Sequence, residues 1–194
     1  GKFIEAADKT TTDQQAFYAV WDNGVGNLAE ANLVAQAVNG TGVSGTGTSN
    51  GNTYFTSTNN DVDWATKKGW YLPLATSSPY LGERIIYPAQ TSRERIIFTT
   101  AAVSSGDPCE STGTGRIFEL DAAKGGMLTY QVLDTNGDND VSNSDSIVSG
   151  LAFNSGIPNL AAIVAGIAPG NDNKYIIDSS GGGVTKLLEK GGSA

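Results

Sequence analysis

The run Asp134–Asp145 holds the residue types best suited to chemistry in this chain. Oxygen-bearing side chains occupy its positions 1, 3, 5 and 12, and a hydrophobic residue occupies position 8. This is the spacing of an EF-hand-like calcium loop, in which alternating side chains turn toward one ion that takes about six to eight oxygens. The predicted ligands are the side chains of Asp134, Asn136, Asp138 and Asp145 and the backbone carbonyl of Asp140, with Ser142 placed to hold a water.

The loop departs from the pattern at two positions. Position 6 is Asn139 instead of glycine, and position 12 is aspartate instead of glutamate. Asparagine tolerates the left-handed conformation better than most residues, so we expect the turn to survive. The competing interpretation is a solvated turn without metal, because Asp and Asn favour turns in any case.

Composition excludes several classes of function. The 194 residues have a net charge of −8 although only 16% are charged, which argues against binding to nucleic-acid phosphates. No run of apolar residues is long enough to span a membrane. Histidine is absent, which removes the commonest general base. Glu119 and Asp121 are a carboxylate pair on one predicted strand, but nothing around them indicates catalysis, and we expect no enzyme activity.

Two further groups of residues have a functional and a structural interpretation. A charged cluster formed by Glu83, Arg84, Arg93, Glu94 and Arg95 is either a partner surface or, as we expect, charge that protects a sheet edge. The tryptophans are Trp21, Trp64 and Trp70. They are able to stack on sugars, but we expect them in the core.

The pattern of elements indicates an all-β chain. Short β-branched and aromatic runs separated by turn residues predict strands at 16–21, 69–74, 84–87, 95–100, 116–121, 128–133, 147–153, 160–165, 174–178 and 183–188. Residues 28–38 are the one credible helix, although the pattern also fits a strand. A Gly/Ser/Thr/Asn-rich segment at 39–60 predicts a flexible excursion. Spacing alone leaves an antiparallel sandwich and a part of a propeller equally favoured.

The single cysteine and the start of the sequence bear on cellular location. Cys109 has no partner within the sequence, so it is either an unpaired thiol or bonded to a cysteine elsewhere. The sequence begins at Gly1 and contains no signal peptide. We interpret it as a piece, 1–194, of a longer secreted or surface protein.

Several segments in this order resemble the C-terminal region of the PilY family of type IV pilus tip-associated adhesin and assembly proteins. The resemblance extends from residue 1 to about 165. Its motifs, weak singly and specific as an ordered set, are Gly1–Glu5, Phe17–Asp22, Gly69–Leu72, Gly82–Ile86, Ile97–Thr100, Asp107–Glu110, Gly113–Asp121 and the Asp134–Asp145 loop.

The resemblance implies part of a modified β-propeller built from short antiparallel strands, with an EF-hand-like loop that binds a regulatory Ca²⁺. It also implies export through the periplasm to the pilus tip or the outer membrane-associated cell surface. The implied partners are minor pilins, other pilus components and host or surface ligands. The implied roles are pilus assembly, the extension and retraction balance of twitching motility, and adhesion.

Some features set this chain apart from the family. Asn139 replaces the usual glycine, and no Arg-Gly-Asp tripeptide occurs, so integrin recognition of that type does not carry over.

Two alternative functions remain. A quinoprotein-dehydrogenase-type propeller enzyme also uses calcium, and a dockerin-like module binds proteins, but dockerins carry two calcium loops followed by helices.

Overall fold

A computed structural model describes residues 5–24, 26–39, 52–102, 113–153, 156–166, 170–181 and 183–191. Two short 3-10 helices, η1 (Ala6–Lys9) and η2 (Glu30–Asn32), are the helical elements of this described part. Its strands are β1 (Ala16–Val20), β2 (Val34–Ala35), β3 (Val38–Asn39), β4 (Thr53–Ser57), β5 (Gly69–Pro73), β6 (Gln90–Ser92), β7 (Arg95–Thr99), β8 (Gly115–Asp121), β9 (Gly150–Phe153), β10 (Pro158–Ala165), β11 (Asn171–Asp178) and β12 (Val184–Lys190). The predicted all-β class is confirmed.

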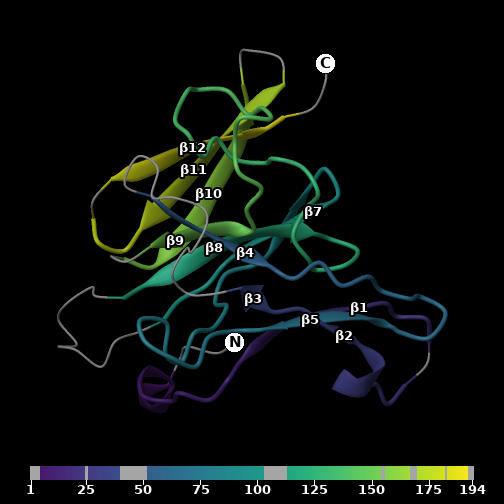
Figure 1. The fold of residues 1–194 in the computed structure, drawn as a ribbon. Coiled ribbons are helices and arrows are strands. Elements are labelled where there is room, and N and C mark those ends of the chain that lie inside the picture. The colour runs from purple at the N-terminus through teal and green to yellow at the C-terminus, as the bar shows by residue number, and fades with distance from the viewer. Residues whose placement is uncertain are drawn as a thin grey trace.

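Three sheets are stacked in layers, and the largest lies in the middle (Figure 1). The middle sheet has the order β3-β4-β9-β8-β7-β6, and its flanking sheets have the orders β1-β5-β2 and β10-β11-β12. All pairs are antiparallel except β2 with β5. The described sheets do not close into a ring or barrel.

The middle sheet is buried on both faces, and its sequence explains why. Neighbouring residues such as Ile117 and Phe118 on β8 point to opposite faces, and each joins a different hydrophobic core. A strand covered on both sides is expected to be a nearly continuous apolar run. Ile96–Phe98 and Ile117–Phe118 are runs of this kind, which is why the sequence predicted β7 and β8 well.

Each flanking sheet supplies one apolar face to a core. Phe17, Trp70 and Leu72 of the β1-β5-β2 sheet pack against the middle sheet, where Phe17 and Phe98 stack with ring centroids 4.4 Å apart. On the other side, Leu160, Ile176 and Leu187 of the β10-β11-β12 sheet complete the second core. The three layers therefore share two hydrophobic interfaces.

Four charged side chains are buried where the middle sheet meets β11 and β12. We call Arg95, Glu119, Lys174 and Glu189 the buried charge cluster; each is at most 1% exposed. Arg95 Nη1 lies 3.0 Å from Glu119 Oε1, Lys174 Nζ lies 2.6 Å from Glu189 Oε2, and Lys174 also pairs with Glu119. Two positive and two negative charges make the cluster neutral, as a buried group of charges must nearly be.

Burial raises the pKa of Glu189, and the nearby Lys174 only partly offsets this effect. Neither carboxylate oxygen of Glu189 makes an aligned hydrogen bond, although Lys174 and Arg95 lie within ion-pair distance. The folded state thus holds a proton on Glu189 more tightly than the unfolded state does. Its contribution to stability is present below the unfolded pKa and is lost as pH rises through the folded pKa.

We therefore predict that Glu189→Gln removes part of the pH dependence of stability. Below the ordinary carboxyl pKa the two proteins should be similarly stable, and the wild type should lose ground to the variant as pH rises toward neutrality. Urea unfolding from pH 4 to 8 in EDTA measures the difference in unfolding free energy. A difference that does not change with pH would contradict the raised pKa.

Some predicted elements are wrong. The helix predicted at 28–38 is replaced by η2 and the short strands β2 and β3. Predicted strands 84–87 and 128–133 are irregular chain with single β-bridges at Arg84 and Leu133. Within the predicted excursion 39–60, Thr53–Ser57 form β4 in the middle sheet, with Tyr54 and Phe55 buried. Residues 40–51 lie outside the described residues, as does Cys109.

The predicted edge charges are mostly in the interior. Glu83, Arg84 and Arg95 are buried, and only Arg93 and Glu94 stand at a surface turn, between β6 and β7. Glu83 is held by Thr100, whose hydroxyl donates to Oε1 at 2.5 Å, and by Arg116, whose Nε lies 2.8 Å from Oε1. The prediction for tryptophan holds for Trp70, but Trp21 and Trp64 are exposed.

Candidate metal site

The Asp134–Asp145 loop begins where the chain runs beside β12. Leu133 forms a β-bridge with Glu189, Asp134 N donates to Leu188 O at 3.1 Å, and Lys190 N donates to Val132 O at 2.9 Å. After the loop the chain continues into β9, where a dockerin would have a helix. The loop therefore begins beside one flanking sheet, and the chain after it leads into the middle sheet.

Side-chain oxygens in the first half of the loop accept backbone N–H groups a few residues ahead. Asp134 Oδ1 accepts from Gly137 N at 2.5 Å, and its Oδ2 accepts from Asn139 N at 3.0 Å. Asn136 Oδ1 accepts from Asp138 N, and Asp138 Oδ1 accepts from Asp140 N, both at 2.9 Å. These successive turns coil the chain, and Asn136 Nδ2 lies 3.0 Å from Asp138 Oδ2.

Asp145 closes the loop. It is 6% exposed, and its Oδ1 accepts from the backbone N–H groups of Thr135 at 2.6 Å and Asn136 at 3.2 Å. Its Oδ2 accepts from Ser142 N at 2.9 Å. The predicted last ligand is thus hydrogen-bonded to both ends of the loop.

One departure from the loop pattern, Asn139, and one residue that fits it, Val141, each have a structural counterpart. Asn139 has a φ of 68°, the left-handed conformation that its position requires, so the expected turn forms without glycine. Val141, the hydrophobic residue at position 8, is 1% exposed, so the loop is packed into the protein interior at this position.

The loop's oxygens keep acceptor positions that its hydrogen bonds do not occupy, and calcium prefers oxygens of this kind. Each carboxylate has about four acceptor positions, and each oxygen of Asp134 accepts only one hydrogen bond within the loop. Among the described residues, no three His, Cys, Asp or Glu side chains gather closely enough to hold a metal by themselves. The predicted set also uses an amide and a carbonyl, so calcium at Asp134, Asn136, Asp138, Asp140 and Asp145 stays a prediction.

Contacts from distant strands hold the loop in place, and no local sequence pattern predicts them. Tyr54 on β4 donates its hydroxyl to Asp134 O at 3.2 Å, and burial raises the pKa of this phenol. Asn171 on β11 donates to Asp140 Oδ1 at 3.1 Å, and Lys190 Nζ donates to Val141 O at 3.0 Å. The loop thus touches two sheets.

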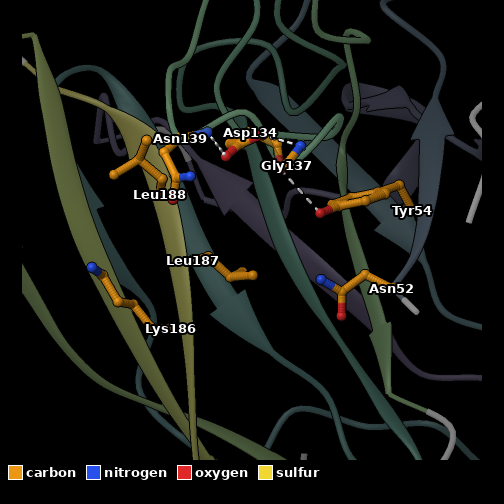
Figure 2. A pocket seen from close by; sticks show the side chains of 8 residues that line it. All are labelled: Asn52, Tyr54, Asp134, Gly137, Asn139, Lys186, Leu187 and Leu188. Carbon is orange, nitrogen blue, oxygen red and sulfur yellow. Dashed lines mark hydrogen bonds between the residues drawn. The ribbon is translucent and has the colours of Figure 1, made fainter. Parts of the chain in front are cut away.

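A cavity of about 210 Å³ lies beside the loop. Asp134, Gly137 and Asn139 form one wall, and the facing walls come from Asn52 and Tyr54 and from Lys186–Leu188 of β12 (Figure 2). In this view the hydroxyl of Tyr54 and the side chain of Asn139 approach the cavity from opposite sides. The cavity lies at the junction of the middle sheet, β12 and the loop.

The carboxylate pair considered for catalysis is split by the fold. Glu119 belongs to the buried charge cluster, whereas Asp121 accepts from Ala123 N and Lys124 N and so forms the turn after β8. The two carboxylates have different partners and structural roles.

In the described part of the chain, no helix is long and apolar enough to cross a membrane.

Comparisons with known proteins agree on one family. No family model matches the chain. The chain is 30% identical over 134 residues to a protein of Xylella fastidiosa strain Temecula1 named type IV pilus biogenesis factor PilY1 homolog, and this match covers 68% of the chain and 9% of the relative. It also resembles the crystal structure of the Pseudomonas aeruginosa PilY1 C-terminal domain, with a TM-score of 0.71 and 20% identity over 99% of the chain and 41% of that structure.

The stacked sheets and the inserted acidic loop define a layered β domain with the fold of a PilY1 C-terminal domain. The sequence match extends this likeness beyond fold, and the chain belongs to the PilY family, as its ordered motifs indicated. It spans about 9% of the curated relative's length, so it carries a small part of such a protein.

Proposed function

We propose that this chain is a calcium-binding, non-catalytic module of a type IV pilus tip adhesin and biogenesis factor. Family membership supports the pilus context, since the relative is named as a pilus biogenesis factor. The observation that carries the calcium assignment is the coiled loop, in which Asp134, Asn136 and Asp138 each hold a backbone N–H ahead of them and Asp145 closes the turn.

Calcium would act by fixing the loop against two sheets. When bound, the ion supplies positive charge that relieves repulsion among the carboxylates of Asp134, Asp138 and Asp145. The loop's own contacts then matter, because Tyr54 joins it to β4 while Leu188 and Lys190 join it to β12. A stiffer loop would hold the middle sheet and the β10-β11-β12 sheet in one arrangement.

The module would belong to a modified β-propeller exported through the periplasm to the pilus tip and the cell surface. It would contact minor pilins and support assembly, the balance of extension and retraction, and adhesion to surfaces. The layered antiparallel sheets and the likeness to a PilY1 C-terminal domain support this placement.

The test is calorimetric titration of the chain with calcium. We predict one binding site in the wild type and none in Asp134→Ala, with circular dichroism showing that the variant stays folded. Asp61→Ala is the matched control, because Asp61 is an 83% exposed aspartate whose partner, Lys124, lies outside the loop. The control should bind calcium as the wild type does.

Two outcomes would contradict the proposal in different ways. Folded protein without binding heat in any of the three proteins would leave the loop as a structural turn. Calcium binding lost in Asp134→Ala, with pilus extension and retraction unchanged in bacteria carrying that substitution, would retain the metal site and remove its role in the pilus.

A further inference from the structure

Lys174 of the buried charge cluster lies against two carboxylates in the protein interior. Its Nζ lies 2.6 Å from Glu189 Oε2 and also contacts Glu119 Oε2, and all three side chains are at most 1% exposed. Glu119 is two residues from Ile117 on β8 and so faces the same core, to which Ile176 of β11 also belongs. An amine and a carboxyl group are therefore held in contact where apolar packing excludes water.

Burial changes the protonation states that this pair can adopt. An ionised group loses its hydration in an apolar interior, and a buried charge tends to become neutral instead. Among the described residues, neither oxygen of Glu189 nor Oε1 of Glu119 makes an aligned hydrogen bond, so hydrogen bonding compensates these charges only in part. Transfer of one proton from Lys174 to Glu119 gives a neutral amine beside a carboxylic acid, the two forms that condense to an amide.

The other two members of the cluster are placed to assist such a condensation. Arg95 Nη1 lies 3.0 Å from Glu119 Oε1, the oxygen that gains negative charge when an amine attacks the carboxyl carbon. Glu189 touches the amine, and burial raises its pKa, which makes it a stronger proton acceptor than an ordinary carboxylate. Contact with a carboxylate oxygen also brings the amine to roughly the 3–3.5 Å from the reacting atom that an attack requires.

We propose that Lys174 and Glu119 condense to an isopeptide bond, which joins β8 of the middle sheet to β11 of the flanking sheet. Lys174 first gives one proton to Glu119 Oε2. Its nitrogen then bonds to the carboxyl carbon, and Glu189 carries a second proton from the nitrogen to Oε2, which leaves as water. The third amine proton stays on the amide. Glu189 is unchanged at the end, and the reaction uses no oxidant, reductant or co-reactant.

The product suits this interior better than the ion pair does. Condensation removes one positive and one negative charge and leaves Arg95 and Glu189, whose charged groups lie 3.5 Å apart. Because buried ions are costly to desolvate, a neutral amide lowers that cost. The fold holds the two groups at an effective concentration on the order of 10⁵ M or more, which favours the amide over its hydrolysis. The bond connects residues 55 positions apart, so the two sheets cannot separate while it is intact.

The test is the intact mass of the denatured chain, measured at intervals after refolding from urea in EDTA, so that the result does not depend on the calcium site. The folded wild type should weigh one water molecule less than its sequence. Tandem mass spectrometry of tryptic peptides should then place the bond between Glu119 and Lys174. Lys174→Arg keeps the charge without an amine that can be acylated, and should have its full mass. Glu189→Gln keeps the reacting pair and should lose water at least about tenfold more slowly.

An exposed ion pair provides the internal control. Lys124 Nζ lies 2.7 Å from Asp61 Oδ1, but the two side chains are 36% and 83% exposed, so they should remain unlinked in the same digest. A wild type that keeps its full mass after folding would overturn the proposal, whether or not the variants fold. A loss of water that persists in Lys174→Arg, or that maps to a bond between Lys174 and Glu189, would overturn it as well. Equal rates in Glu189→Gln and the wild type would overturn the role of Glu189 as the proton carrier.

Discussion

Lys174→Met should destabilise the fold by about 3–5 kcal/mol, the usual cost of removing one partner from a buried ion pair. Lys174 is 1% exposed and pairs with both Glu119 and Glu189. Methionine fills similar space without charge, so the loss comes from two buried carboxylates left with Arg95 alone. Urea unfolding at pH 7 in EDTA should show a lower midpoint with an unchanged slope.

Lys186→Met is the matched control for this experiment. Lys186 lies on β12 opposite Tyr175, one position along β11 from Lys174, but it is exposed. Its replacement should change stability by no more than about 0.5 kcal/mol, as is usual for surface sites. Similar costs in the two variants would mean that burial of Lys174 does not matter.

The stability of Lys174→Met should depend on pH and on a second substitution. Protonation of a carboxylate relieves the excess negative charge, so the deficit of Lys174→Met should shrink as pH falls. Adding Glu189→Gln should also recover part of the loss, because it removes one of the unpaired charges. A double-mutant cycle measures this coupling, and strictly additive costs would contradict a shared cluster.

The sequence predicted strands best where burial leaves a simple pattern. Apolar runs such as Ile96–Phe98 belong to strands buried on both faces and could be assigned without knowledge of the fold. Residues 53–57 were missed because they follow a Gly/Ser/Thr/Asn tract, although Tyr54 and Phe55 supply both cores. Leu28–Val38 has apolar residues at helical spacing, but pairing of Val34 with Trp70 on β5 decides for strand.

Buried charge was the main feature that local sequence did not predict. Glu83, Arg95 and Glu119 look like surface residues because their partners are distant along the chain. Arg116 lies 33 residues from Glu83, and Lys174 lies 55 residues from Glu119. Only the sheet order brings these pairs together, so their neutral, buried arrangement becomes visible with the fold.

The loop shows the same division between local and distant information. Its turns come from side chains bonding to N–H groups a few residues away, which spacing alone encodes. Its position depends on Tyr54, 80 residues away, and on Asn171, 31 residues away. The ligand set was therefore a sequence prediction, whereas the coupling of the loop to two sheets required the structure.

Asp145→Ala should impair both the stability of the fold and calcium binding. The aspartate is buried and accepts hydrogen bonds from Thr135, Asn136 and Ser142, so alanine leaves these N–H groups without their partner. Each buried group left unsatisfied costs about 1–3 kcal/mol. We expect the variant to lose stability on the order of 2–4 kcal/mol in EDTA, before calcium enters, and to lose calcium binding as well.

Asp138→Ala provides the comparison, since Asp138 is an exposed predicted ligand. It should keep wild-type stability in EDTA to within about 0.5 kcal/mol and lose only the extra stability that calcium gives, which is roughly 2.7 kcal/mol at one hundred times Kd. Urea unfolding in EDTA and in excess calcium separates the two effects. If Asp145→Ala matched the wild type in EDTA, loop closure would depend on the metal and not on this carboxylate. If both variants still gained stability from calcium, the ion would bind elsewhere.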